Sequence, residues 1–303
     1  MSDRVAEIAE AVEAMLQRRF VVAGKRADIV VGLIGRGIEL SRTPAMHERE
    51  AARLGLTCSY LLLDFDVLRL TDADIGAALE AARGLGFNGV NVTYPFKQAV
   101  IPLLDDISPE AETIGAVNTV VLGSRMVGHN TDYWGFAESF RMHMAGVAMG
   151  HVTMFGAGGA GSAVGAALIG LGARHVTIAD TDRTRAAELA RRLDRIEGVT
   201  VSVAGDVREA IENADGIVNT TPVGMAKYPG APFPTEWLHA GQWVADVIYF
   251  PRETALLRDA RLAGCRTLPG IGMAIGQAVR AFEHFTGRPA DMSSMAGHFE
   301  AAA

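Results

Sequence analysis

The sequence has few cysteines, little positive charge and no long apolar run. Its two cysteines, Cys58 and Cys265, are far apart, and none of its eight histidines has a second one at metal-ligand spacing. A disulfide framework is therefore excluded, and no bound metal is expected. The net charge of −7 argues against a nucleic-acid partner, because such proteins need basic surface to displace counterions. Neither a signal pattern nor a bilayer-spanning stretch appears, so we expect a cytoplasmic protein without membrane partners.

The 303 residues are enough for two domains of ordinary size. Apolar runs typical of buried strands alternate with helical patterns, and the clearest runs are residues 29–34, 58–64, 151–155 and 176–179. Further helices are predicted over residues 72–85, 133–144 and 270–285, and a further strand over 243–249. This alternation predicts an α/β fold with open, mostly parallel sheets.

The first 28 residues begin with an apolar stripe at helical spacing and carry glutamates on the other face. The stripe consists of Val5, Ile8, Val12, Met15 and Leu16. An acidic polar face is unsuited to a membrane surface. Two interpretations stay open, a contact between the subunits of a homodimer or an outer layer on the first domain.

Residues 86–97 combine a short buried strand with polar side chains at its end. Asn91 and Thr93 alternate with valines, and Pro95 cannot continue a central strand because it lacks a backbone donor. The chain must turn there and present Thr93 and Lys97 at the carboxyl end of the strand, where open α/β sheets bind ligands. Taken alone, a lysine just past a strand end is more often only a solvated surface residue, because most lysines are exposed.

Two other positions allow both a structural and a functional interpretation. Ser41 and Thr43 precede Pro44 and a predicted helix, so they either cap that helix or receive an anion beside its free amides. Asp132 precedes the helix predicted over 133–144 and could serve as its N-cap.

A dinucleotide-binding motif follows the strand at 151–155. Gly156, Gly158 and Gly161 fit Gly-x-Gly-x-x-Gly, a helical pattern follows, and Asp180 ends the next strand about 20 residues on. The glycines let the backbone approach a pyrophosphate, and the carboxylate accepts hydrogen bonds from a ribose. The context favours a nucleotide cofactor in this half of the chain.

The acidic pair Asp180 and Asp182 indicates which nucleotide is bound. A 2′-phosphate about 4 Å from a carboxylate costs about 4 kcal/mol at a surface-like dielectric. NAD is therefore expected and NADP disfavoured, although Arg183 and Arg185 are close enough in sequence to reduce the repulsion.

The sequence Asn-Val-Thr-x-Pro-x-Lys ending at Lys97 resembles a motif of the shikimate dehydrogenase family. Gly-Ala-Val-Asn-Thr at 115–119, Asp132 and the strand and turn at 216–225 match further family motifs. The similarity extends from about residue 29 to 285. Thr43 and the carboxylates at 180 and 182 resemble the NAD-preferring quinate/shikimate dehydrogenase branch, since NADP-using members tend to carry Asn-Arg-Thr at 180–182.

The resemblance implies a role for each matching residue. Lys97 and Asp132 are the implied catalytic pair, with the aspartate orienting the lysine. The implied substrate-binding residues are Ser41, Thr43, Asn91, Thr93, Asn118, Tyr249 and Gln277. The expected cofactor-binding residues are Gly156, Ala157, Gly158, Gly159, Ala160, Gly161, Asp180, Asp182, Arg185, Thr220, Pro222, Gly270 and Met273.

These interpretations give one expected function. A substrate-binding domain of residues 1–132, completed by 272–303, is expected beside a Rossmann-type NAD-binding domain of residues 133–271. The expected reaction moves a hydride between NAD and the ring 3-hydroxyl or 3-keto group of shikimate or quinate, in aromatic amino acid biosynthesis or quinate catabolism. A monomer or homodimer is expected, with a small-molecule substrate as its partner. The alternatives are a dehydrogenase of an amino analogue of shikimate and a non-catalytic regulatory module that binds the cofactor.

Overall fold

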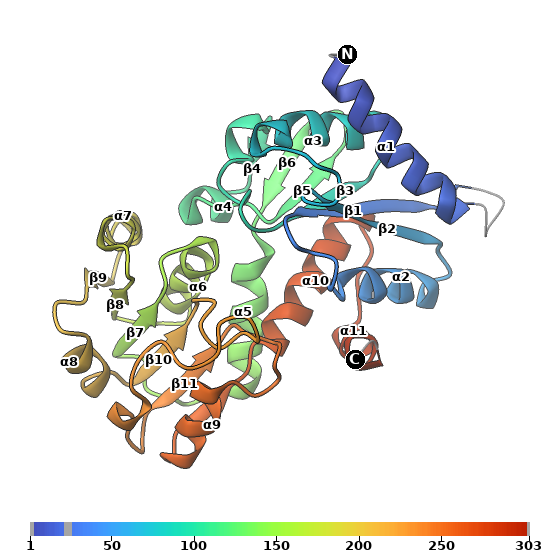
Figure 1. Cartoon of the computed structure of the whole chain (residues 1–303). Coiled ribbons are helices and arrows are strands. Elements are labelled where there is room, and N and C mark those ends of the chain that lie inside the picture. Colours follow the sequence, from blue (N-terminus) through green and yellow to red (C-terminus); the bar gives the residue numbers. More distant parts are fainter. Residues whose placement is uncertain (1–2, 21–25, 302–303) are drawn as a thin grey trace. The chain divides into compact units, whose positions relative to one another are not determined.

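The computed structural model describes residues 3–20 and 26–301 and has two compact units. One unit comprises Met1–Thr131 and Ala278–Ala303, and the other is Asp132–Gln277. The chain therefore builds most of the first unit, completes the second, and then returns to the first, so that red helices lie beside blue strands in Figure 1. Both units combine helices with a sheet, and the expected two-domain α/β class is confirmed.

The sheet of the first unit has the strand order β2-β1-β3-β5-β6-β4. β5 runs antiparallel to both of its neighbours, and the other pairs are parallel. The strands are β1 (Ile29–Gly35), β2 (Cys58–Asp64), β3 (Gly89–Val92), β4 (Asp106–Ile107), β5 (Thr119–Leu122) and β6 (Met126–His129). β1 and β3 are buried along their whole length, as the apolar run at 29–34 and the valines at 90 and 92 predict.

Helices cover both faces of this sheet (Figure 1). One face carries α1 (Asp3–Phe20) and α3 (Ile75–Gly84), and the other carries α2 (Thr43–Arg53) and α11 (Met292–Ala301). The remaining helices are α4 (Pro109–Ile114) and α10 (Ile271–Thr286), which crosses the boundary between the units.

The apolar stripe of α1 is used inside its own unit. Ile8, Val12 and Leu16 are buried in the core that α3 also lines, and the guanidinium of Arg4 binds Asp74 at 2.8 Å. The helix therefore forms an outer layer on its own unit, and a contact between subunits stays a prediction. Residues 1–2 and 21–25 of the predicted segment lie outside the described residues.

The sheet of the second unit is entirely parallel, with the order β12-β11-β10-β7-β8-β9. Its strands are β7 (His151–Phe155), β8 (His175–Ala179), β9 (Thr200–Val203), β10 (Gly216–Asn219), β11 (Trp243–Asp246) and β12 (Arg266–Leu268). Its helices are α5 (Thr131–His143), α6 (Gly159–Gly170), α7 (Arg183–Leu193), α8 (Val207–Glu212) and α9 (Ala255–Leu262). The strand order reverses between β7 and β10, which is the position where open parallel sheets bind nucleotides.

The strand predicted over residues 243–249 is too long. β11 ends at Asp246, whose carboxylate accepts hydrogen bonds from the Ile248 amide at 3.0 Å and the Thr254 hydroxyl at 2.7 Å. These local bonds turn the chain, so Tyr249 lies three residues beyond the strand. None of the helices in the described residues combines the length and apolar character needed to cross a bilayer.

Candidate active site

Asn91 and Asn118 meet at the carboxyl end of β3, where both are buried. The amide of Asn91 donates to the Asn118 carbonyl at 3.3 Å and to the Thr119 hydroxyl at 3.0 Å. Thr93 follows at the end of β3, half-buried, and its backbone amide donates to the Ile34 carbonyl. Three of the predicted substrate-binding residues therefore share one edge of the first unit's sheet.

The backbone at Lys97 and the backbone before Asp132 are joined through one short segment. The Lys97 carbonyl accepts a hydrogen bond from the Val117 amide at 2.8 Å. The next residue, Asn118, accepts one from the Thr131 amide at 2.8 Å through its side-chain oxygen. Asp132 follows directly and is buried. Val117 and Asn118 therefore hold in place the backbone of both candidate catalytic residues, at Lys97 and just before Asp132.

The N-cap interpretation of Asp132 is wrong in position. α5 begins at Thr131, because the Asn118 side chain binds the Thr131 amide, and Asp132 lies in the first turn of the helix. A carboxylate there still interacts favourably with the positive end of the helix dipole.

Neither Ser41 nor Thr43 is the N-cap of α2, although the Ser41 hydroxyl accepts a hydrogen bond from the Thr43 amide at 3.4 Å. The N-cap of α2 is Arg42, which makes no side-chain cap hydrogen bond, and Thr43 is the first helical residue. The two hydroxyls lie 3.2 Å apart and are partly exposed at the start of the helix. Two neighbouring hydroxyls beside the helix's free amides can receive an anion such as a carboxylate.

Two glycines of the turn after β7, Gly156 and Gly161, are required by the backbone itself. Gly156 has a φ of +100°, and a Cβ on Gly161 would lie 2.2 Å from the Gly156 carbonyl oxygen. A Cβ on Gly158, in contrast, would meet nothing within 4 Å. The space in front of Gly158 and the start of α6 at Gly159 is thus open, which fits the approach of a dinucleotide's pyrophosphate to the backbone. Contacts of that pyrophosphate with Ala157, Gly158, Gly159 and Ala160 stay a prediction.

Asp180 binds directly to this turn. Its carboxylate accepts hydrogen bonds from the Ala157 amide at 2.7 Å, the Asp182 amide at 2.8 Å and the Arg185 guanidinium at 2.9 Å. Burial acts to raise the pKa of Asp180, but the bonds to Arg185 and the two amides outweigh it and hold that pKa below its usual value. The carboxylate is therefore ionised at neutral pH. Asp182 caps α7 by accepting from the Arg185 amide at 3.1 Å.

Thr220 supports the glycine turn from β10. Its buried hydroxyl lies 2.7 Å from the Phe155 carbonyl and 3.0 Å from the Gly156 carbonyl, so its hydrogen is already used. Pro222, two residues on, is exposed. A contact of either residue with the cofactor remains a prediction.

Three further candidates, Gly270, Met273 and Gln277, lie at the end of the second unit, where backbone segments pack closely together. A Cβ on Gly270 would lie 2.2 Å from the Val247 carbonyl oxygen, so only glycine fits before α10. Met273 and Gln277 follow on α10, where it packs against α5 so closely that a Cβ on Gly135 would be 2.6 Å from their backbone atoms. Tyr249, a fourth candidate, is exposed to 42%.

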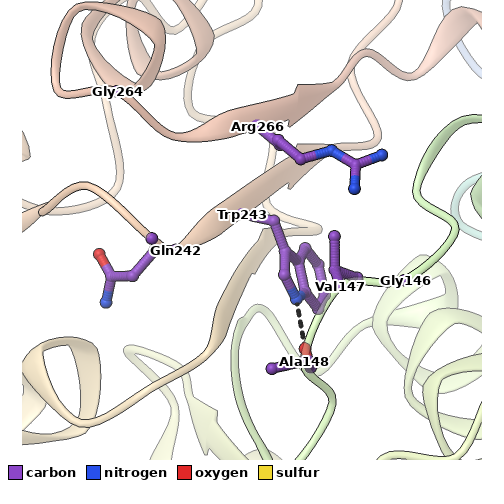
Figure 2. Close-up of a pocket in the computed structure, with 8 residues that line it drawn as sticks. Gly146, Val147, Ala148, Gln242, Trp243, Gly264 and Arg266 are labelled. Carbon is purple, nitrogen blue, oxygen red and sulfur yellow. Dashed lines mark hydrogen bonds between the residues drawn. The ribbon is translucent and has the colours of Figure 1, made fainter.

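Figure 2 shows a hollow of the second unit that lies away from these residues. It is lined by the residues that precede β11 and β12 and by the loop after α5, so it is at the amino ends of the strands. Trp243 donates to the Ala148 carbonyl, and Arg266 donates to the carbonyls of His143 and Ala145. The polar groups in its wall are thus bound to backbone, and the hollow has no part in the predicted site.

Sequence reasoning missed several residues that hold the predicted ones. The Tyr60 hydroxyl donates to Asn91 at 2.8 Å, and Thr119 and Thr131 surround the amide of Asn118. In the second unit, Asp246 lies 3.1 Å from the amide of Asn219, which binds the Val223 carbonyl. Their signal was weak, since Tyr60 stands within an apolar strand and Asp246 within a strand pattern.

Family models match three parts of the chain. The shikimate dehydrogenase substrate binding domain matches residues 33–120, and the shikimate 5′-dehydrogenase C-terminal domain matches residues 270–296. The C-terminal domain of alanine dehydrogenase/PNT matches residues 137–235.

Full-length relatives agree with these matches. Shikimate dehydrogenase (NADP(+)) of Streptomyces avermitilis is 52% identical over 88% of this chain and 93% of its own. Quinate/shikimate dehydrogenase (NAD(+)) of Corynebacterium efficiens is 47% identical over 89% of this chain and 97% of its own. The structure of quinate dehydrogenase from Corynebacterium glutamicum in complex with NAD is similar with a TM-score of 0.85, at 44% identity over 90% of this chain and 99% of that one. This chain therefore belongs to the shikimate dehydrogenase family.

Proposed function

We propose that this chain is a shikimate or quinate dehydrogenase that prefers NAD and transfers a hydride to or from the ring 3-hydroxyl carbon. The carboxylate of the substrate is received by Ser41 and Thr43, and its ring hydroxyls by Asn91, Thr93, Asn118 and Gln277. Residues 1–132 with 272–303 form the substrate-binding domain, and residues 133–271 bind NAD. The observation that carries the proposal is the hydrogen-bonded path from Lys97 through Val117 and Asn118 to Thr131, the residue before Asp132.

This path supports the catalytic roles because it fixes both peptide segments against two consecutive residues, Val117 and Asn118. Lys97 takes the hydroxyl proton as hydride leaves the same carbon, and Asp132 orients the ammonium group. When bound, NAD supplies nicotinamide C4 as the hydride acceptor. In the reverse direction, Lys97 returns the proton to the oxygen of the 3-keto group.

The preference for NAD rests on the two carboxylates that follow β8. Asp180 is ionised and hydrogen-bonded to the Ala157 amide, and Asp182 caps the next helix. A 2′-phosphate would meet negative charge there, whereas two ribose hydroxyls would meet acceptors. The relatives from Streptomyces and Corynebacterium are named for different nucleotides, so the preference of this chain is inferred from these two carboxylates.

The test is an activity screen of the purified protein. Shikimate and quinate are each offered with NAD and with NADP, and the appearance of reduced nicotinamide is followed by absorbance. Activity with at least one substrate, higher with NAD and lost in Lys97→Ala, is the expected result. No activity with either substrate and either nucleotide would overturn the proposal.

A further inference from the structure

Tyr60 is a fully buried residue whose hydroxyl reaches the candidate substrate site from two strands away. It lies on β2, level with Val31 of β1, while Asn91 of β3 lies level with Leu33. Partners in a parallel ladder share a face, as do residues two apart in one strand, so Tyr60 and Asn91 are on the same face of the sheet. The phenol crosses β1 diagonally and donates to Asn91 Oδ1 at 2.8 Å.

The orientation of the Asn91 amide follows from its partners. A backbone carbonyl can only accept, so the atom that faces the Asn118 carbonyl must be the nitrogen of the Asn91 amide. Its two hydrogens are then used by that carbonyl and by the Thr119 hydroxyl. The oxygen accepts from Tyr60 and retains one lone pair. Asn91 can therefore only accept a further hydrogen bond.

The Asn118 amide is fixed in the opposite sense. Its oxygen faces the Thr131 amide, which can only donate, and its nitrogen donates to the Thr131 hydroxyl at 3.1 Å. Among the described residues this is the single acceptor for that nitrogen, so one hydrogen is still available. Neighbouring amides thus offer an acceptor at Asn91 and a donor at Asn118.

We propose that Tyr60 is a positioning residue that fixes Asn91 as a hydrogen-bond acceptor and so selects a hydroxyl group on the substrate ring. The inference rests on the proposed function and extends it to specificity. A hydroxyl gives one hydrogen and accepts another, which suits both amides. A keto group has no hydrogen for Asn91, and a ring ammonium has no acceptor for Asn118.

The surroundings keep this arrangement unchanged over a wide pH range. Burial raises the pKa of the Tyr60 phenol well above its usual value, so the O–H remains a donor. The ring of His47 packs against Tyr60 with centroids 4.9 Å apart. His47 is also fully buried, and burial lowers its pKa to about 3, so it stays neutral. Tyr60 has no exposed surface, so any effect on the substrate must pass through Asn91.

The test is Tyr60→Phe, which removes the hydroxyl and keeps the ring. We expect kcat/KM for the better of shikimate and quinate to fall about tenfold, the usual cost of one lost buried hydrogen bond. The KM for NAD should not change. In an Asn91→Ala background, Tyr60→Phe should cause no further loss, because the hydroxyl acts through Asn91.

Shikimate analogues that each lack one ring hydroxyl identify the hydroxyl on which the loss of kcat/KM in Tyr60→Phe depends. For the analogue without the hydroxyl that Asn91 accepts from, wild type and Tyr60→Phe should have equal kcat/KM. Ser59→Ala is the matched control, since it removes a buried hydroxyl from the adjacent position and opposite face of β2. It should leave every one of these values unchanged.

Two results would overturn the inference. One is an unchanged kcat/KM in Tyr60→Phe. The other is an equal loss of kcat/KM with every analogue and in the Asn91→Ala background, which would mean that Tyr60 has only a structural role. Should Tyr60→Phe fail to fold, Tyr60→Met also lacks the hydroxyl, has a flexible apolar side chain that can fill the space of the ring, and is judged by the same comparisons. A wild type inactive with both substrates would instead refute the proposed function.

Discussion

The guanidinium of Arg185 binds the carboxylate of Asp180 at 2.9 Å, and the same carboxylate accepts the Ala157 amide of the glycine turn. Arg185 is thereby directed toward a carboxylate of its own chain. A 2′-phosphate would have to compete with Asp180 for that guanidinium while facing the carboxylate of Asp182.

We therefore expect kcat/KM with NAD to exceed that with NADP by at least about a hundredfold, allowing for screening of the repulsion. Asp180→Ala should reduce NAD use more than it improves NADP use, because it also removes the partner of the Ala157 amide. Steady-state kinetics with both nucleotides measure this. Asp206→Asn, which alters the N-cap of α8 instead, is the control. Comparable efficiencies in the wild type would contradict the assignment.

Lys97→Ala should lower kcat about a hundredfold to ten-thousandfold, the usual contribution of a positioned acid or base. The affinity for NAD should be nearly unchanged. Asp132→Asn keeps the shape and removes the charge, so its loss should be large alone and far from additive with Lys97→Ala. Single and double variants are compared at saturating NAD over a range of pH. A change in kcat of less than twofold for Lys97→Ala would mean that the residue is only a solvated surface charge.

Replacing Ser41 or Thr43 should raise the KM of the acid substrate and leave that of NAD almost unchanged. Each hydroxyl contributes about 1 kcal/mol or more to a charge-assisted bond with a carboxylate, which is about fivefold or more in KM. Ser41→Ala and Thr43→Val are measured with both substrates varied in turn. Equal changes in the two KM values would point to a role in the structure of α2.

Asp246 should make the wild type less stable as the pH rises from about 4 to 6. Burial raises its pKa to about 6, and bonds from Thr254, Ile248 and Asn219 offset only part of that effect. The folded state then holds a proton that the unfolded state loses first, so stability falls with rising pH in this window, by at most about 3 kcal/mol. Thermal unfolding of wild type and Asp246→Asn at pH 4 and pH 7.5 checks this. A constant difference between the two proteins would show that Asp246 does not titrate as described.

The stacked rings of His129 and His284 should have the opposite effect in the other unit. Their centroids are 4.0 Å apart. Burial, then the neighbouring His129 and Arg280, lower the pKa of His284 to about 4, while Glu110 opposes the shift. The unfolded state binds the proton first, so stability is present above about pH 6.5 and is lost as the pH falls toward 4. His284→Phe keeps a stacked ring and should lose less stability on acidification. His151→Phe replaces an exposed histidine that stacks on His175 in the second unit, and it is the control for the loss of one imidazole ring.

Features that depend on neighbouring residues in sequence were predictable. The strand over 58–64 was placed at the observed bounds of β2, because an apolar run between polar residues is a local signal. The glycine turn and Asp180 form one local βαβ unit, and their predicted proximity is observed in the bond between Asp180 and Ala157.

Features that depend on strand order were not predictable in the same way. Tyr60 reaches Asn91 only because β1 lies between β2 and β3 in this register. The start of α5 at Thr131 depends on Asn118, 13 residues earlier in the chain. Likewise, Asp246 ends β11 early through Thr254, and nothing in the apolar pattern of 243–249 signals that bond.

The return of α10 and α11 to the first unit also sets an order of events during synthesis. Phe282 and Phe285 pack against His47, and Met295 and Phe299 are buried beside α2. The apolar core on this face of the first unit is therefore incomplete until residues 278–303 have been made. The ribosome needs roughly 10 to 30 s to make the intervening Asp132–Gln277 segment. During that interval the core of the first unit cannot be completed, although most of its residues have already been made.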